Sequence, residues 1–155
     1  MVAVAHEIEN LTLNINQEIH VRASLEKTFA SVLEQMGPSN TGPDGRPMRM
    51  TIEPWPGGRW FRDRGNGIGH LWGHVQVIKP PVLLELSGPM FMSYPALNHV
   101  ELRLDQVAGG TKVSLRHRAI GFLDAAHREG LGKGWRHYLD SIRKDFADGV
   151  AAHRA

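Results

Sequence analysis

The sequence contains no cysteine among its 155 residues. This absence excludes disulfide bonds, catalytic thiols and thiolate metal sites. It is also compatible with a reducing compartment, and we expect the protein in the cytoplasm. No apolar run approaches the roughly 18 residues that a membrane span requires. The first residues include Glu7 and Glu9 and no basic lead, so we expect no secretory signal peptide.

The chain also has little excess charge of either sign. Its 18 basic and 16 acidic residues give a net charge of +2, which is too small to indicate a nucleic-acid partner. A hydrophobic content of 41% is ordinary for a soluble globular protein. A chain of this length is expected to form one domain. We therefore predict a single domain over residues 1–155.

The hydrophobic pattern predicts a sheet followed by a long helix. Alternation of apolar and polar residues predicts strands at residues 11–21, 48–53, 59–63, 68–78, 82–86, 99–107 and 112–118. Helical spacing predicts a helix over 25–36, with Ser24 as its N-cap. A longer amphipathic helix is predicted from Trp135 onward, and residues 121–134 are irregular or begin it. An antiparallel sheet with helices on one face is an α+β architecture.

The strand at 68–78 carries an aromatic side chain and two histidines on one face. Alternation places Trp72 on the outer face of the sheet, together with His70 and His74. A tryptophan exposed on this face indicates that a partner covers it, and a second copy of the chain in a homodimer is one such partner. Four residues along a strand span about 13 Å, so the two imidazoles are too far apart to bind one metal ion. We expect no metal and no other cofactor.

Several short motifs occur in a particular order along the chain. They are Pro56-Gly57-Gly58-Arg59-Trp60, Gly73-x-Val75, Ile78-x-Pro80-Pro81-x-Leu83, Gly110-Thr111-x-Val113-x-Leu115-x-His117 and Gly134-Trp135. In this order they resemble the START-like, or SRPBCC, helix-grip superfamily. Within it, the sequence is most similar to the family named after the activator of the heat-shock protein 90 ATPase. The resemblance covers about residues 12–152.

The resemblance implies a specific fold and a range of functions. The implied fold is a seven-stranded antiparallel sheet wrapped around a long C-terminal helix, with a cavity between them. Members of the superfamily bind lipids, sterols, polyketides or plant hormones. Some are cyclases or aromatases, and some are parts of ring-hydroxylating oxygenases.

A set of side chains is predicted to face this cavity. An apolar lining with a few polar groups is typical of small-molecule sites, although the same residues could simply form the core. The predicted ligand-binding residues are Trp60, Arg62, Leu71, Val75, Phe91, Tyr94, Val100, Leu102, Leu115, His117, Phe122, Trp135 and Leu139.

Three functions remain open from the sequence. The first is binding of a hydrophobic or amphipathic small molecule without chemistry, with Arg62, His117 or Tyr94 orienting its polar end. The second is a cyclase-like, aromatase-like or hydrolase-like enzyme, in which His117 is the acid–base group and Arg62 stabilises an enolate-like charge. The third is a protein-interaction module with a co-chaperone-like role, using the outer face of the sheet or the connection at residues 90–94.

Overall fold

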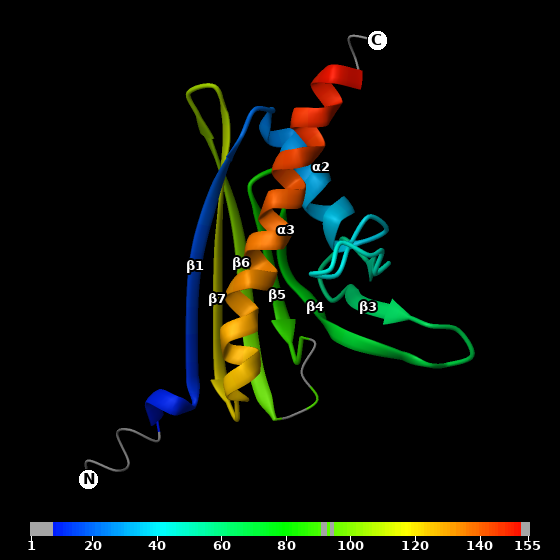
Figure 1. The fold of residues 1–155 in the computed structure, drawn as a ribbon, viewed down its shortest axis with the longest axis vertical. Helices are drawn as coiled ribbons and strands as arrows, with labels where there is room; N and C mark the ends of the chain where they lie inside the picture. The colour runs from blue at the N-terminus through cyan, green and yellow to red at the C-terminus, as the bar shows by residue number, and fades with distance from the viewer. Residues whose placement is uncertain (1–7, 91–92, 94, 153–155) are drawn as a thin grey trace.

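The computed structural model describes residues 8–90, 93 and 95–152, with no side chains described for 148–152. The elements are β1 (Thr12–Val21), α2 (Leu25–Met36), β2 (Thr51–Ile52), β3 (Arg59–Asp63), β4 (Gly69–Lys79), β5 (Leu83–Gly88), β6 (Ala96–Val107), β7 (Gly110–Gly121) and α3 (Ala125–Ala152). In the described chain, seven strands form an antiparallel sheet in the order β1-β7-β6-β5-β4-β3-β2 (Figure 1). The predicted α+β helix-grip fold is confirmed.

The β6–β7 hairpin contains the two longest strands of the sheet, of 12 residues each. Its two strands pair in register from Ala96↔Gly121 to Val107↔Gly110. The apolar residues of one parity, such as Val100, Leu102 and Leu115, are buried as predicted. Burying each such side chain stabilises the fold by about 1.5–3 kcal/mol, which makes this face the core.

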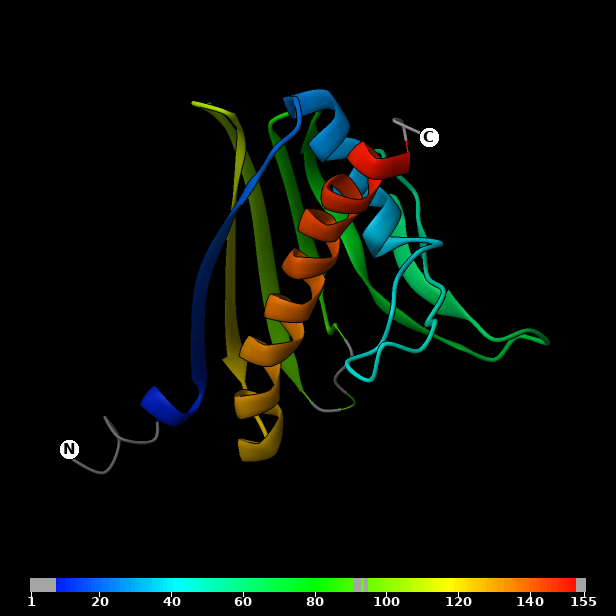
Figure 2. The same ribbon diagram turned by 45° about the horizontal axis from the view of Figure 1, so that its top comes forward.

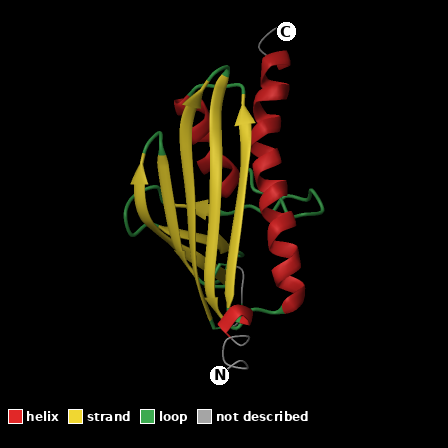
Figure 3. Ribbon diagram, turned by 90° about the vertical axis from the view of Figure 1, so that its left-hand side faces the viewer, coloured by secondary structure: helices red, strands yellow, loops and turns green. Residues whose placement is uncertain are grey.

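Helix α3 covers that face and packs along one side of the sheet (Figure 3). It contacts β1 and also α2, whose N-cap is the predicted Ser24. The Tyr138 hydroxyl donates to the carbonyl oxygen of Val32 at 2.9 Å, and Gln35 donates to the Asp145 carboxylate at 3.0 Å. These bonds hold the two helices together on one layer. Among the described residues, no helix combines the length and the hydropathy that crossing a membrane requires.

Helix α3 begins ten residues earlier than the apolar spacing predicts, at Ala125 rather than Trp135. The three glycines at 130, 132 and 134 have low helix propensity and hide the pattern in this stretch. Packing against β1 and a cap at Asp124 override that propensity. The Asp124 carboxylate accepts a hydrogen bond from the Ala126 backbone N–H at 2.8 Å, as an N-cap does.

The strands on the β2 side also differ from the prediction. Strand β2 is two residues long, whereas the alternation predicts a strand over 48–53. The turn before β3 is fixed by Arg59, whose guanidinium makes two hydrogen bonds of 2.8 and 2.9 Å to the Glu53 carboxylate. This pairing lowers the pKa of Glu53 to about 2. The turn sets the direction of β3 and so the placement of Trp60.

The Asp124 cap predicts the outcome of a substitution. Asp124→Ala removes the acceptor for the first backbone N–H groups of α3, and should lower the free energy of unfolding by about 1 kcal/mol. Asp124→Asn retains a side-chain acceptor and should lose much less. Urea unfolding followed by circular dichroism measures both. Equal losses for the two variants would contradict the cap.

Candidate functional site

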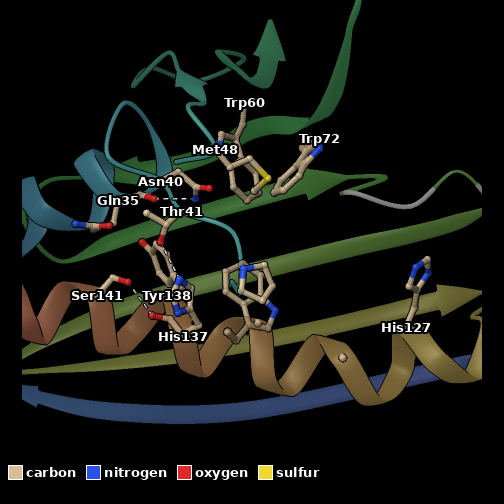
Figure 4. A pocket seen from close by; sticks show the side chains of 14 residues that line it. Gln35, Asn40, Thr41, Met48, Trp60, Trp72, His127, His137, Tyr138 and Ser141 are labelled. Carbon is tan, nitrogen blue, oxygen red and sulfur yellow. Dashed lines mark hydrogen bonds between the residues drawn. The ribbon is translucent and has the colours of Figure 1, made fainter. Parts of the chain in front are cut away.

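A pocket of about 330 Å³ lies between α3, the connecting segment at residues 37–50 and the β3–β4 hairpin (Figure 4). Figures 1 and 2 show this segment between α3 and β3. The pocket is partly open to solvent, and its volume is at the small end of the roughly 300–1,000 Å³ typical of ligand pockets. Its lining residues come from regions far apart in the sequence.

Aromatic side chains form two walls of the pocket. On the sheet side, the rings of Trp60 and Trp72 meet edge to face, with centroids 5.0 Å apart. On the helix side, Trp135 and Tyr138 meet in the same way, at 5.6 Å. Edge-to-face contacts of this kind stabilise aromatic clusters beyond the area that they bury. The two pairs therefore form preformed apolar walls.

Three of these aromatic residues have their polar atoms bonded within the protein. The Trp60 indole N–H donates to the carbonyl oxygen of Met36 at 2.8 Å. The Trp135 indole N–H donates to Nδ1 of His117 at 2.8 Å, and the Tyr138 hydroxyl donates to the backbone of α2. Because burial raises the pKa of Tyr138 well above its usual value, its hydroxyl stays protonated. The walls thus present mainly apolar ring surface to the cavity.

The prediction that Trp72 faces outward is wrong. Trp72 is 9% exposed and lines the same pocket as Trp60. The reason is a bulge: Trp60 pairs with Gly73 while Phe61 pairs with Leu71, so Trp72 is an extra residue on β4. A bulge shifts the alternation of side chains by one. Leu71, predicted to face inward, is consequently 46% exposed.

The polar part of the lining comes from the connecting segment together with α2 and α3. The hydroxyl of Thr41 and Nε2 of His137 are hydrogen-bonded at 2.8 Å, which ties this segment to α3. Asn40 donates from Nδ2 to the Gln35 carbonyl oxygen at 2.9 Å. Figure 4 shows these side chains along one side of the cavity. Among the described lining residues there is no Asp, Glu, Lys or Arg.

Two glycines of α3 keep the pocket open. Gly130 and Gly134 line it, and a Cβ built on either would meet nothing within 4 Å. A glycine in a helix interior costs about 0.5–1 kcal/mol relative to alanine. Packing does not demand these glycines, so their effect is to leave space for the cavity.

His117 lies in the core behind Trp135 and does not line the pocket. It is fully buried, Nδ1 accepts from Trp135, and Nε2 is 2.7 Å from Oδ1 of Asn98. An indole N–H can only donate, so Nδ1 is unprotonated and Nε2–H donates to Asn98. Burial lowers the pKa of His117 to about 4, with a smaller contribution from His99. It is therefore a neutral structural residue with both ring nitrogens engaged.

The other predicted ligand-binding residues fall into four groups. Trp60 and Trp135 line the pocket. The residues buried in the core instead are Val75, Val100, Leu102, Leu115 and Leu139. Two residues lie neither in the pocket nor in the core. Arg62 is partly buried on β3 and is not among the lining residues. Phe122, predicted to face inward, is 67% exposed. Phe91 and Tyr94 lie outside the described residues.

Sequence reasoning missed most of the actual lining. Tyr138 lies one helical turn after Trp135 and could have been found from that spacing. Trp72 could not, because the bulge is not visible in the pattern. The contribution of Asn40 and Thr41 depends on how the connecting segment folds back on α3. Among the described residues, no three His, Asp or Glu side chains come together as a metal site would require.

The sequence also matches a known family. The model of the family described as "Activator of Hsp90 ATPase homolog 1-like protein" matches residues 45–147. The chain belongs to this family. The matched region runs from the connecting segment through β2–β7 to α3, and so includes most of the pocket-lining residues. No curated protein matches the chain.

Solved structures share the fold at low sequence identity. A protein from Chromobacterium violaceum is 16% identical with a TM-score of 0.69, over 86% of this chain and 96% of that one. The di-domain ARO/CYC StfQ from the steffimycin biosynthetic pathway is 15% identical with a TM-score of 0.66, over 96% of this chain and 54% of that one. CalU16 from Micromonospora echinospora is 22% identical with a TM-score of 0.57, over 85% and 71%. These likenesses show that the family member shares its fold with those proteins.

The helix glycines give a stability prediction for this family member. Gly134→Ala should raise the free energy of unfolding by about 0.5–1 kcal/mol, because alanine is the better helix former and its Cβ meets open space. Gly58→Ala is the matched contrast, since its Cβ would overlap the carbonyl oxygen of Glu53, and it should be destabilised. Urea unfolding compares them. A loss of stability in Gly134→Ala would show that the space is not open.

The buried His117 gives a pH prediction. The folded chain keeps this ring neutral down to about pH 4, whereas the unfolded chain protonates it near pH 6.5. Protonation therefore favours the unfolded state as pH falls below 6.5, and this loss stops growing below about 4. Between pH 7 and pH 5 it should amount to about 2 kcal/mol.

The measurement compares urea midpoints at the two pH values. His117→Gln should show a smaller difference in stability between pH 7 and pH 5 than the wild type, although it is less stable at both. Val113→Ala creates a cavity at a fully buried site without removing a titrating group, so it should keep the wild-type difference. An unchanged difference in His117→Gln would show that His117 does not cause the pH dependence.

Proposed function

We propose that the protein binds a small, mainly apolar molecule in the pocket between α3, the connecting segment and the β3–β4 hairpin, and does so without chemistry. The observation that carries this proposal is the aromatic lining. Trp60, Trp72, Trp135 and Tyr138 surround a cavity that no side chain fills. Apolar lining with a few placed polar groups is the usual composition of a small-molecule site.

The retained helix glycines support the same proposal. Each of Gly130 and Gly134 gives up helix stability at a position where alanine would fit. Filling the cavity would also bury more apolar surface and stabilise the fold. Keeping the cavity open therefore lowers the free energy of unfolding. Binding of a ligand in the cavity explains why the chain keeps it open.

The geometry does not favour the enzyme hypothesis in the form that uses His117 and Arg62. His117 is separated from the pocket by the ring of Trp135, and both of its nitrogens are engaged. Arg62 does not join it, because it is on β3 and outside the pocket lining. A general base must be within hydrogen-bond reach of the proton that it removes. The similarity to the ARO/CYC StfQ concerns the fold and supplies no acid–base pair.

The protein-interaction hypothesis depends on exposed apolar surface. Leu97 and Ile120 are 73% and 58% exposed and pair across β6 and β7. Two adjacent exposed apolar side chains form only a small patch, and small patches of this kind are common on soluble proteins. With Trp72 in the pocket, the outer face also loses the aromatic residue that suggested a dimer. The pocket is therefore the better-supported site.

A pocket-filling variant tests the proposal. The neutral probe N-phenyl-1-naphthylamine should bind the wild type with a rise in its fluorescence. Gly134→Leu places a side chain in the cavity and should weaken binding at least tenfold, a loss of about 1.4 kcal/mol. Gly134→Ala should bind more nearly like the wild type, because it fills much less of the cavity.

Two controls make the result interpretable. Circular dichroism confirms that Gly134→Leu is folded, and Trp55→Phe removes a tryptophan that is 55% exposed and outside the pocket lining. Trp55→Phe should bind the probe normally. Wild-type affinity in folded Gly134→Leu would place the probe elsewhere and contradict the proposed pocket. Independently of the probe, native mass spectrometry of protein purified from its own host would identify any molecule that the protein retains.

A further inference from the structure

Asn40 is held rigidly at the edge of the pocket. Its backbone N–H donates to Gly37 O at 3.1 Å, and its carbonyl oxygen accepts from the Met48 N–H at 2.8 Å. Its side-chain Nδ2 donates to the Gln35 carbonyl oxygen at 2.9 Å. Because a backbone carbonyl can only accept, this bond assigns the amide orientation, with nitrogen toward Gln35 and oxygen on the other side.

The oxygen placed by this arrangement has no protein partner. Oδ1 of Asn40 is buried and makes no hydrogen bond to any described residue. Asn40 lines the pocket, and Figure 4 shows its oxygen on the side away from Gln35. A buried acceptor without a donor is unfavourable, so a group that donates to it gains affinity. The neighbouring Thr41–His137 bond holds this part of the segment against α3.

The rest of the lining limits the kind of donor. Aromatic rings from both walls favour a ligand with an aromatic body, through edge-to-face and stacked contacts. The described lining contains no carboxylate to compensate a cationic donor, and burying an unpaired charge is costly. A neutral hydroxyl or amide N–H therefore fits Oδ1 better than an ammonium group does.

We propose that Asn40 Oδ1 is the polar anchor of the pocket and selects neutral aromatic ligands that carry a hydroxyl or N–H donor. This inference rests on the proposed ligand-binding function and adds the ligand class and the residue that recognises it. The fixed amide places one acceptor without a protein donor at one edge of a mainly apolar cavity. The donor must therefore lie at one end of the ligand, with the ring system against the tryptophans.

The test compares two ligands that differ in one donor. 2-Naphthol carries a hydroxyl, whereas 2-methoxynaphthalene has the same ring system and no donor. Each displaces N-phenyl-1-naphthylamine from the wild type, and competition gives their affinities. We expect 2-naphthol to bind roughly three- to tenfold more tightly, the range expected for one net hydrogen bond. The ratio of the two affinities is the quantity measured.

Variants of Asn40 test whether this residue causes the difference in affinity between 2-naphthol and 2-methoxynaphthalene. Asn40→Ala should bring the ratio of the two affinities close to one. Asn40→Ser is the second variant in case Asn40→Ala does not fold, because it keeps a small polar side chain but lacks the amide oxygen. It should also lower the ratio. Met48→Leu changes another lining residue without altering the acceptor, and should keep the wild-type ratio even if both affinities change.

The outcomes separate this inference from the proposed function. If both ligands bind the wild type with equal affinity, the pocket binds aromatic molecules but the anchor is wrong. If a folded Asn40 variant keeps the wild-type preference for 2-naphthol, another group recognises the hydroxyl and the inference is overturned. If the probe binds the pocket but neither ligand displaces it, the proposed function stands and the inference about the ligand class is overturned. If the probe itself does not bind, both proposals fail.

Discussion

The hydrogen bond from the Trp135 indole to His117 fixes α3 against β7 of the sheet. His117 in turn bonds Asn98 on β6, and Asn98 donates to the carbonyl oxygens of Gly88 and Pro89 at the end of β5. One chain of side-chain bonds therefore joins α3 to three neighbouring strands. Because all of these groups are buried or partly buried, breaking one bond would leave others without partners. The distance between helix and sheet, and so the existence of a pocket, depends on this chain.

The pocket itself comes from departures from regular structure. A bulge on β4 turns Trp72 inward, and glycines on α3 remove the side chains that would fill the space. At the same bulge, a Cβ on Gly73 would lie 2.7 Å from Ser87 O, so only glycine permits the close approach of β4 and β5. A perfectly regular sheet and an alanine-rich helix would pack more tightly. Such local costs are typical of functional sites in otherwise consistent folds.

Membership of the Activator of Hsp90 ATPase homolog 1-like family and the similarity to solved structures agree on the fold. They do not decide between ligand binding, catalysis and protein interaction, because this fold carries several functions. The argument for ligand binding comes from this chain's own residues: aromatic walls, bonded polar atoms, and one buried amide oxygen. The sequence predicted His117 as a ligand-binding or acid–base residue. These features lie in the pocket, whereas His117 lies in the core behind Trp135.

The sequence by itself determined the elements that depend on local periodicity. Strands β1, β6 and β7, helix α2 and the apolar face of α3 follow from alternation or helical spacing, since backbone geometry fixes which neighbours share a face. Trp60 and Trp135 were found in this way. Only the tertiary structure decided that Trp72 turns inward, that packing against β1 keeps the glycine-containing start of α3 helical, that His117 is sealed in the core and that Asn40 reaches the pocket. Each of these depends on contacts between residues distant in the chain, and no local pattern records such contacts.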